Sequence, residues 1–409
     1  MTRIRVLIAT SQYWPEIAGN APYVTGLAEG LAVAGHRVTA VTGYPHYPQW
    51  RRQGPLRLFS HEKRNGVTVR RRWHYVPGAH SALHRLLYEA TLTAGGLTAI
   101  GARRRPDAVV GVVPSLSGAL LAAIAAKVYR RPLVLVFQDL MGRAAEQSGY
   151  AGGSRVARTL SRFELALARR ADAVGIITPG FRQYLEAGGV SAERIHRVRN
   201  WHLGEPPKQE RAETRRALGW PEDAYICLHA GNMGHKQGLS NLVEAARLLP
   251  GGAVRIVLAG DGNERERLER EASDVPGERI TFLGPQAPGA YEAMLAAADV
   301  LLVNQLPAVS DMALPSKLTS YFAAGRPVVA AVAAESEAAH EVTLAGAGIV
   351  VPAGEPGQLA DVLLSLHREP GKADTFGEAG RAYATRALSR DAALAEYEAM
   401  IRSAIDRTP

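Results

Sequence analysis

A glycine-rich loop at residues 231–238 is the segment of this 409-residue sequence best suited to bind an anion. It reads Gly-Asn-Met-Gly-His-Lys-Gln-Gly and lies between a predicted strand and a predicted helix. Glycines let backbone N–H groups approach a phosphate closely, and Lys236 adds a point charge. The loop therefore predicts a site for a diphosphate leaving group, with a plain turn and a solvated lysine as the alternative. A phosphate-loop NTPase is excluded because no Gly-Lys-Ser/Thr follows.

Three other loops place backbone amides beside predicted helix starts, where the helix dipole favours an anion. Each of them alone is also explained as a turn, and none is the Gly-x-Gly-x-x-Gly of a dinucleotide-binding dehydrogenase. A proline at a helix start leaves the following N–H groups without intrahelical partners, so they can bind a phosphate or sugar oxygen. The three segments are Gly19-Asn20, Gly260-Asp261-Gly262 and Pro315-Ser316-Lys317-Leu318.

A few titratable side chains follow predicted strands. Asp139 comes after an apolar run, which places a carboxylate at the sheet edge where ligands bind, with a turn cap as the alternative. His46 and the adjacent Tyr47 are candidates for the acceptor side, although a structural histidine is an equal explanation. His235 is a candidate phosphate contact. Because no Asp-x-Asp occurs, we expect a site that needs no metal and no other cofactor.

Apolar runs alternate with helical patterns along the whole chain. Such continuous runs are typical of parallel strands that are covered on both faces. The alternation predicts an α/β fold of two Rossmann-like, doubly wound domains that face each other across a cleft. The predicted strands are 4–9, 38–42, 67–71, 108–113, 133–137 and 173–178 in the first half, and 226–230, 254–259, 280–283, 300–303, 328–331 and 348–351 in the second.

A segment rich in helix and strand breakers, residues 200–212, marks the middle of the chain. We therefore predict an N-terminal domain at 1–205 and a C-terminal domain at 206–389. The last segment, 390–409, is predicted to form an amphipathic helix that crosses back onto the first domain. The apolar side of this helix carries Ala393, Tyr397, Met400, Ile401 and Ile405.

Charge is distributed unevenly between the two halves. Residues 1–205 carry a net charge of +16 and residues 206–409 carry −7, which gives +9 for the chain. This asymmetry suggests an anionic partner for the first half, although arginine-rich solvated surfaces also explain it. The leucine-rich segment 81–102 lies among arginines and is a candidate contact with an anionic membrane surface or a polyprenyl diphosphate, with core packing as the alternative. No nucleic-acid-binding motif is present, so we expect no nucleic acid partner.

The single cysteine, Cys227, cannot form an intramolecular disulfide, which favours a reducing cytoplasm. No signal peptide is visible before the first apolar strand. The longest uncharged stretch, 108–126, is interrupted by Pro114, so we read it as a strand, a loop and a helix instead of a membrane span. We expect a cytoplasmic protein, soluble or peripheral at the inner face of the membrane.

Nine short segments, spread in order over essentially the whole chain, resemble one known family. They are Tyr13–Glu16, Gly19–Tyr23, Gly35–Thr42, Tyr44–Pro48, Gln138–Leu140, Asn200–Trp201, Gly231–Met233, Gln237–Gly238 and Pro315–Lys317. The family is glycosyltransferase family 4, which comprises retaining transferases of the GT-B architecture. The sequence looks most like the colanic-acid or O-antigen fucosyl- or N-acetylfucosaminyltransferase subgroup.

The resemblance implies transfer of a sugar from a nucleotide-diphosphate donor, such as a UDP-sugar, to an acceptor hydroxyl with retention and without a metal. The implied acceptor is a polyprenyl-diphosphate-linked glycan or a small-molecule glycoside. The resemblance also implies that the domain at 1–205 binds the acceptor and the domain at 206–389 binds the nucleotide-sugar donor. Lys236, which would neutralise the leaving diphosphate, and Asp139 are the candidate catalytic residues, and His46 and Tyr47 the acceptor-side candidates. The donor-binding candidates are Gly19, Asn20, Asn232, His235, Lys236, Gly260, Asp261, Gly262, Leu283, Asp311, Ser316, Lys317, Leu318 and Ser320.

The sequence departs from the family pattern at three positions. Many members have an arginine at the position of Asn232 and a pair of glutamates that would fall at Met312 and Ser320. The usual carboxylate contacts with ribose and sugar hydroxyls are thus in doubt, and Asp311 is a candidate substitute. Two alternatives stay open. One is a nucleotide-sugar 2-epimerase, whose chemistry needs carboxylates that are scarce here, and the other is an inactive sugar-nucleotide-binding partner of another transferase.

Overall fold

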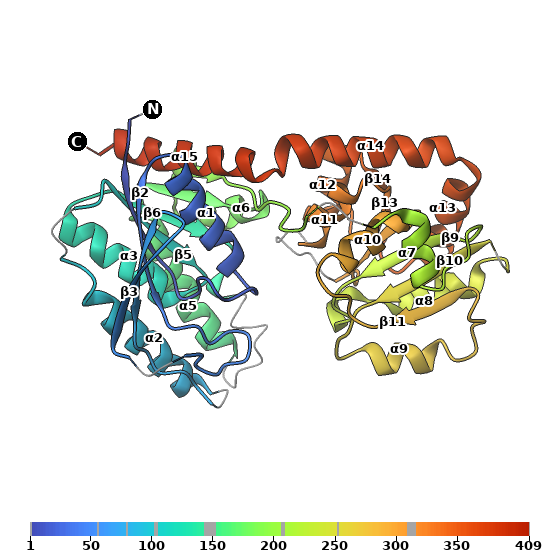
Figure 1. Ribbon diagram of the computed structural model, residues 1–409, viewed down its shortest axis with the longest axis horizontal. Coiled ribbons are helices and arrows are strands. Elements are labelled where there is room, and N and C mark those ends of the chain that lie inside the picture. Colours follow the sequence, from blue (N-terminus) through green and yellow to red (C-terminus); the bar gives the residue numbers. More distant parts are fainter. Residues whose placement is uncertain are drawn as a thin grey trace. The chain divides into compact units, whose positions relative to one another are not determined.

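The computed structural model describes residues 2–54, 57–78, 81–101, 105–142, 153–205, 209–251, 253–308 and 316–408. The chain forms two compact units, one of Met1–Asn200 with Arg390–Pro409 and one of Trp201–Ser389 (Figure 1). The first unit ends five residues before the predicted boundary at 205. The final segment belongs to the first unit, where the sequence placed it.

An eight-stranded sheet forms the centre of the first unit, in the order β3-β4-β2-β1-β5-β6-β7-β8. All neighbouring strands are parallel except β3, which is antiparallel to β4. The predicted strands are confirmed to within two residues, and two strands were missed, β3 and β8. The bounds are β1 Arg5–Ala9, β2 Arg37–Gly43, β3 Phe59–Arg64, β4 Val67–Arg72, β5 Ala108–Val113, β6 Leu133–Phe137, β7 Ala173–Ile176 and β8 Ile195–Arg197.

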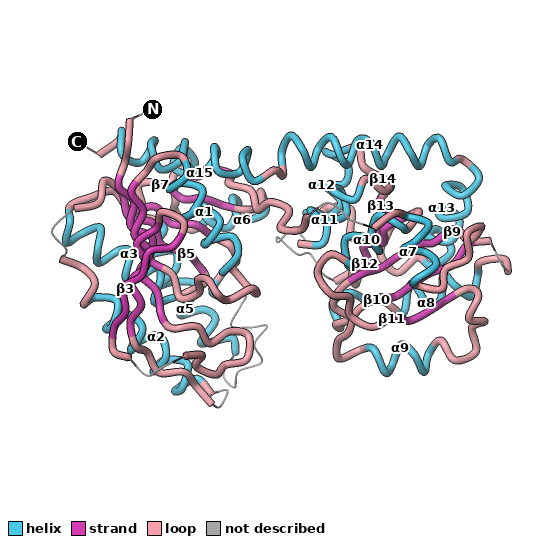
Figure 2. Tube along the Cα trace, in the orientation of Figure 1, coloured by secondary structure: helices cyan, strands magenta, loops and turns pink. Residues whose placement is uncertain are grey.

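Helices cover both faces of this sheet (Figure 2). Helices α1 and α15 contact each other on one face, and α3 contacts both α2 and α5 on the other. Helix α15 buries Tyr397, Met400 and Ile401 and contacts β5, β6 and β7, so the prediction of a returning helix is confirmed. The bounds are α1 Ala21–Val33, α2 Ala82–Leu97, α3 Leu116–Tyr129, α5 Gly153–Ala168, α6 Gly180–Ala187, η1 Ala192–Arg194 and α15 Arg390–Asp406.

The second unit contains a six-stranded, fully parallel sheet in the order β11-β10-β9-β12-β13-β14. Every one of these strands was predicted from its apolar run, because a strand covered on both faces has few polar positions. The bounds are β9 Tyr225–Ala230, β10 Val254–Ala259, β11 Ile280–Leu283, β12 Val300–Asn304, β13 Val328–Ala331 and β14 Gly348–Val351.

Two separate apolar clusters lie on the two faces of the second sheet. One is built around Tyr321 and Phe322, and the other around Leu242, Leu359 and Leu363. The helix carrying Tyr321 starts on the sheet edge that holds the glycine loop, so core packing positions its first turn. The bounds are α7 Arg211–Ala217, η2 His235–Gln237, α8 Ser240–Leu248, α9 Arg265–Glu271, α10 Ala290–Ala297, α11 Lys317–Ala324, α12 Glu337–Ala345, α13 Pro356–Arg368 and α14 Pro370–Ala387.

Candidate active site

In the second unit, the glycine loop after β9 and the loop after β10 pack backbone against backbone. A Cβ atom added to Gly260, whose φ is +137°, would lie 1.9 Å from the carbonyl oxygen of Gly231. A Cβ atom on Gly262 would lie 2.4 Å from the carbonyl oxygen of Met233, whose N–H donates to the Asp261 carbonyl at 2.8 Å. The glycines at 260 and 262 therefore allow a close approach that side chains would prevent. The structure brings two of the predicted donor loops together.

The carboxyl ends of β10 and β11 are held by one guanidinium. Arg265 Nη1 donates to the Gly260 carbonyl at 2.6 Å and to the Leu283 carbonyl at 3.0 Å, and the Gly260 N–H donates to Leu283 as well. The Asp261 side chain is exposed, and its Oδ1 accepts the N–H of Gly262 at 2.8 Å. Leu283 and Asp261 thus lie beside the glycine loop, as expected for one binding edge.

Lys317, the first residue of α11, places its ammonium next to this loop. Its Nζ lies 3.3 Å from Nε2 of His229 and 3.7 Å from the position of a Cβ on Gly231. Burial lowers the pKa of Lys317 to about 7. Burial and, second, the Lys317 charge lower the pKa of His229, so this imidazole is neutral and Nε2 can accept from the ammonium. Lys317 has no carboxylate partner among the described residues, so its charge is available to an anion.

His229 was not predicted from the sequence. It is fully buried in β9, one residue before the strand ends. The only sequence signal was a histidine inside an apolar strand that leads into the glycine loop.

The other candidates on α11 lie on different sides of its first turns. Ser316 is exposed at the N-cap and its carbonyl accepts the Thr319 hydroxyl at 2.8 Å, whereas Leu318 is buried in the core. The side chain of Ser320 hydrogen-bonds Tyr291 and faces a pocket of about 350 Å³ whose wall includes Glu292. Leu318 can therefore contribute only its backbone to a ligand. Asp311, Met312 and Pro315 lie outside the described residues.

Lys236, the predicted leaving-group cation, lies on the short η2 turn. Its side chain is exposed, as are those of Asn232 and His235. The turn itself is held by a side chain, because Gln237 Oε1 accepts the Gly234 N–H at 3.1 Å. Lys236 has no side-chain partner within the described ranges. The glycine loop is thus flanked by two lysines. The sequence singled out the exposed Lys236 as the leaving-group cation, and the structure shows that the ammonium of Lys317 is buried beside the loop.

In the first unit, the loop before α1 exposes Gly19 in a left-handed conformation with φ +61°. A Cβ on Gly19 would lie 2.7 Å from Oε1 of Gln12, and that same oxygen accepts the N–H of Asn20 at 3.0 Å. The side chain of Gln12 therefore holds the Gly19-Asn20 turn in place, and the start of α1 remains accessible. The Asn20 N–H is thus occupied by Gln12, and binding of a donor by this loop stays a prediction.

Asp139 follows β6 directly, as expected. Its Oδ1 accepts the N–H of Leu140 at 2.8 Å, so the carboxylate does cap the turn. The next amide, of Met141, donates to Glu164, which also accepts the Tyr184 hydroxyl at 3.0 Å. Burial raises the pKa of Glu164 to about 7. The sequence analysis did not single out Glu164, because a glutamate within a helical pattern reads as a surface residue.

His46 and Tyr47, the acceptor-side candidates, differ in exposure. The His46 side chain is 1% exposed, and its Nδ1 lies 3.0 Å from the Tyr44 carbonyl. Its pKa is lowered by burial. The ring packs against His74, Trp50 and Tyr88. The burial of His46 favours the structural role that the sequence left open, and an acceptor contact at the half-exposed Tyr47 stays a prediction.

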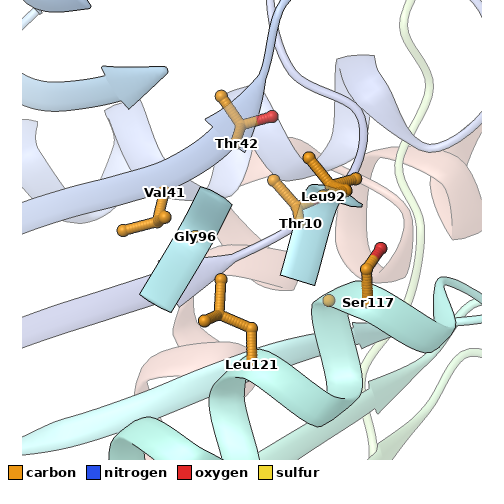
Figure 3. Close-up of a pocket in the computed structure, with 8 residues that line it drawn as sticks. Thr10, Val41, Thr42, Leu92, Gly96, Ser117 and Leu121 are labelled. Carbon is orange, nitrogen blue, oxygen red and sulfur yellow. The ribbon is translucent and has the colours of Figure 1, made fainter. Parts of the chain in front are cut away.

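A small cavity lies among Thr10, Thr42 and Ser117, between the ends of β1 and β2 and the start of α3 (Figure 3). Its volume is about 10 Å³, enough for about one water molecule. The Thr42 hydroxyl is buried and has no hydrogen-bond partner in the part of the chain that the structure describes. The cavity is too small for a sugar and suits a structural water.

Comparisons with known proteins identify the family of this chain. The model of the Glycosyl transferase 4-like domain matches residues 18–201, and that of Glycosyl transferases group 1 matches residues 210–383. WcaI of Escherichia coli (strain K12), named as a colanic acid biosynthesis glycosyl transferase, is 30% identical over 408 residues, which cover 96% of this chain and 98% of WcaI. The chain belongs to glycosyltransferase family 4.

Solved structures show the same fold for this glycosyltransferase. Sucrose-phosphate synthase from Thermosynechococcus elongatus is 20% identical with a TM-score of 0.69, and the match covers 98% of both chains. HepE of Anabaena, solved with UDP-glucose, is 18% identical with a TM-score of 0.67 and covers 98% of this chain and 100% of its own. The architecture is GT-B, with two Rossmann-like units.

The glycosyltransferase has no helix, within its described segments, that is long and apolar enough to cross a membrane. The uncharged stretch 108–126 forms β5 and most of α3, as predicted. Over the same segments, no group of three or more His, Cys, Asp or Glu side chains could hold a metal ion.

Proposed function

We propose that this glycosyltransferase moves a sugar from a UDP-sugar to an acceptor hydroxyl with retention and without a metal, in the synthesis of a cell-surface polysaccharide. The name of WcaI, which refers to colanic acid biosynthesis, supports the polysaccharide assignment. The UDP-glucose complex of HepE supports the nucleotide.

The observation that carries the proposal is Lys317 beside the glycine loop. When the donor's C1–O bond breaks, its electron pair stays on the terminal phosphate oxygen as negative charge. Donors fixed in advance stabilise this charge more in the transition state than before it. The Lys317 ammonium provides such a donor, and the exposed Lys236 can approach the same diphosphate.

Bond formation in this proposal needs no protein base. The acceptor oxygen bonds to C1 on the face that the diphosphate leaves, and the acceptor proton moves to the departing phosphate oxygen. Asp139 is the carboxylate proposed to contact the sugar or the acceptor hydroxyl from the first unit. Metal independence follows from the two lysines, which supply the positive charge that a cation would provide.

Thermal unfolding with a panel of UDP-, GDP- and dTDP-sugars tests the donor assignment. A ligand at one hundred times its Kd stabilises the folded state by about 2.7 kcal/mol. For a unit of roughly 200 residues this raises the Tm by about 5–10 °C. We expect UDP-sugars to give this increase and the others to give less. No increase with any sugar nucleotide at millimolar concentration would refute the function, and turnover that depends on added divalent cation would refute metal independence.

The proposed acceptor is a polyprenyl-diphosphate-linked glycan at an anionic membrane surface. Helix α2 exposes Leu83, Leu86, Leu87 and Leu97, with exposed fractions of 64%, 60%, 44% and 38%. The core-packing alternative is therefore wrong for these leucines. An exposed apolar stripe on a half of the chain with a net charge of +16 suits anionic headgroups.

Flotation with anionic liposomes tests the membrane surface. We expect wild type to float with vesicles that contain phosphatidylglycerol at low salt and to dissociate as salt rises. The L83E/L86E variant should stay at the bottom, while V128E, a matched change of an exposed valine on α3, should float like wild type. Absence of wild-type binding would favour a small-molecule glycoside as acceptor.

A further inference from the structure

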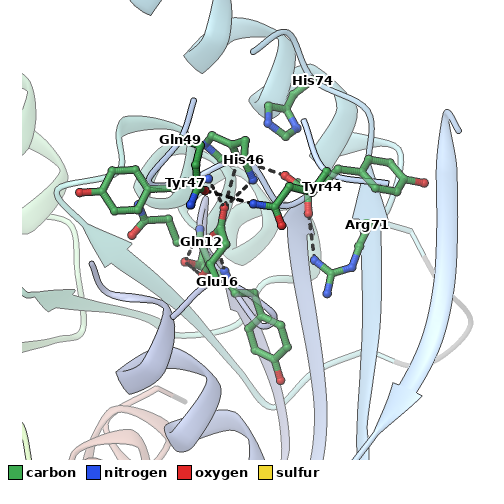
Figure 4. A network of polar contacts seen from close by, with 12 residues as sticks. Gln12, Glu16, Tyr44, His46, Tyr47, Gln49, Arg71 and His74 are labelled. Atoms are coloured by element: carbon green, nitrogen blue, oxygen red, sulfur yellow. Dashed lines mark hydrogen bonds and ion pairs between the residues drawn. The ribbon is translucent and has the colours of Figure 1, made fainter. Parts of the chain in front are cut away.

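A buried carboxylate, Glu16, joins two loops at the edge of the first sheet. Its side chain is 2% exposed. Oε1 accepts the backbone N–H of His46 and that of Tyr47, both at 2.8 Å, and Oε2 accepts the N–H of Tyr13 at 3.3 Å (Figure 4). Glu16 lies in the loop between β1 and α1, whereas His46 and Tyr47 lie in the loop after β2. One carboxylate thus binds backbone groups of both loops.

No fixed positive side chain pairs with Glu16 among the described residues. The described group that pairs with it is His46, whose Nδ1 lies 3.4 Å from Oε1, and burial lowers the pKa of that ring. An ionised carboxylate only accepts hydrogen bonds, which matches the three N–H donors around it. The negative charge of Glu16 is therefore stabilised by the backbone of the two loops, and its loss would leave buried N–H groups without partners.

Arg71 of β4 performs the complementary role for carbonyl groups. Its guanidinium donates to the Trp14 carbonyl in the first loop and to the Gly43 carbonyl at the end of β2, and it pairs with Glu62. Arg71 is 5% exposed. The two buried charges therefore fix the same two loops through different backbone atoms, one through N–H groups and the other through carbonyls.

We propose that Glu16 is a positioning residue that holds the loop of Tyr47 on the loop of Gly19 and Asn20. This inference rests on the proposed function and on the roles that the family resemblance implies, with the first of these loops on the acceptor side and the second on the donor side. Glu16 touches neither substrate. It acts through the amides of His46 and Tyr47, and so fixes the acceptor-side loop relative to the donor-side loop.

Amide hydrogen exchange tests the loop contact without any substrate. In E16A we expect peptides that cover residues 44–48 to exchange at least about tenfold faster, with the strands β1 and β2 unchanged. In E16Q the side-chain oxygen can still accept from His46 and Tyr47, so exchange should stay near the wild-type rate. The matched control is E29Q, which removes a carboxylate that pairs with Arg64. Unchanged exchange in E16A, or an increase across the whole unit, would overturn the proposal.

The consequence for catalysis is tested by steady-state hydrolysis, with the UDP-sugar that stabilises the wild-type protein most. We expect E16A to lower kcat about tenfold or more with KM within about twofold, because the two lysines proposed to bind the diphosphate belong to the other compact unit. E16Q should recover most of kcat, and E29Q should match wild type. A kcat in E16A equal to wild type would refute the positioning role. If wild type neither binds nor hydrolyses a sugar nucleotide, the proposed function fails, while hydrogen exchange still decides the loop contact.

Discussion

Replacing Lys317 by methionine removes the buried ammonium beside the glycine loop and keeps a side chain of similar length. A charge-assisted hydrogen bond to an ionised group contributes about 1.5–3 kcal/mol. We therefore expect the affinity for a UDP-sugar at pH 7 to fall about 10- to 100-fold. The fold should persist, because the partner of the ammonium, His229, is neutral and loses only one hydrogen bond.

The lowered pKa of Lys317 also predicts a proton uptake on binding. With a pKa of about 7 in the free protein, Lys317 is roughly one tenth protonated at pH 8 and roughly nine tenths protonated at pH 6. A bound diphosphate keeps the ammonium charged, so binding should take up about 0.9 proton at pH 8 and about 0.1 at pH 6. The affinity should fall up to about tenfold per pH unit above pH 7.

Isothermal titration calorimetry in phosphate and Tris buffers measures this uptake, because the two buffers differ in ionisation enthalpy. A UDP-sugar is the right probe, since both of its phosphates are already ionised at pH 6 and the proton must go to the protein. The uptake at pH 8 should vanish in K317M and persist in K236M. Binding without proton uptake at pH 8, or an undiminished uptake in K317M, would refute the reasoning.

The same pKa predicts how the stability of the free protein depends on pH. The pKa of Lys317 is lowered from 10.5 to about 7, so between these values the unfolded chain holds more protons than the folded one. Stability should therefore rise with pH across this window through this residue. Chemical denaturation at pH 7 and pH 9 should show a smaller rise in K317M than in wild type.

Three further changes have defined outcomes. G260A should lower the free energy of unfolding by more than about 2 kcal/mol, measured by urea denaturation, because its Cβ would lie 1.9 Å from the Gly231 carbonyl oxygen. K236A should lower kcat about tenfold or more and leave the Tm unchanged, since the side chain is exposed; wild-type kcat would remove its catalytic role. D139N keeps an oxygen for the Leu140 amide, so a loss of kcat at constant Tm would show that the charge acts on substrate.

The sheet of the second unit was predictable because its strands are buried on both faces and read as apolar runs. The edge strand β3 was missed because it is almost entirely polar and alternates between exposed and half-exposed positions. A local signal did exist. Asn65-Gly66 connects β3 to β4 with positive φ at both residues, and this dipeptide favours two-residue hairpins. The turn sequence therefore predicts the hairpin that contains β3, whereas the hydropathy pattern of this strand does not.

The site was only partly predictable, because its buried charges depend on contacts between distant segments. Lys317 and His229 are 88 residues apart in the sequence, and Glu16 and His46 are 30 apart. The glycine spacing identified the loop, since close backbone approach is a local property. Which lysine is buried beside the loop depends on the packing of α11 on β9, which no local pattern records.

One buried charge in each unit, Glu16 in the first and Lys317 in the second, is satisfied by neutral groups and not by an ion of opposite sign. Glu16 accepts backbone N–H groups, and the Lys317 ammonium lies against a neutral imidazole. For Glu16, which fixes a loop, neutral partners mean that no basic side chain has to be shared between this carboxylate and an anionic substrate. For a group that binds a diphosphate, it means that no internal ion pair must break first, and the desolvation that lowers the pKa of Lys317 is offset when the ligand arrives. A carboxylate introduced beside Lys317 should therefore raise its pKa, stabilise the free protein and weaken the binding of a UDP-sugar.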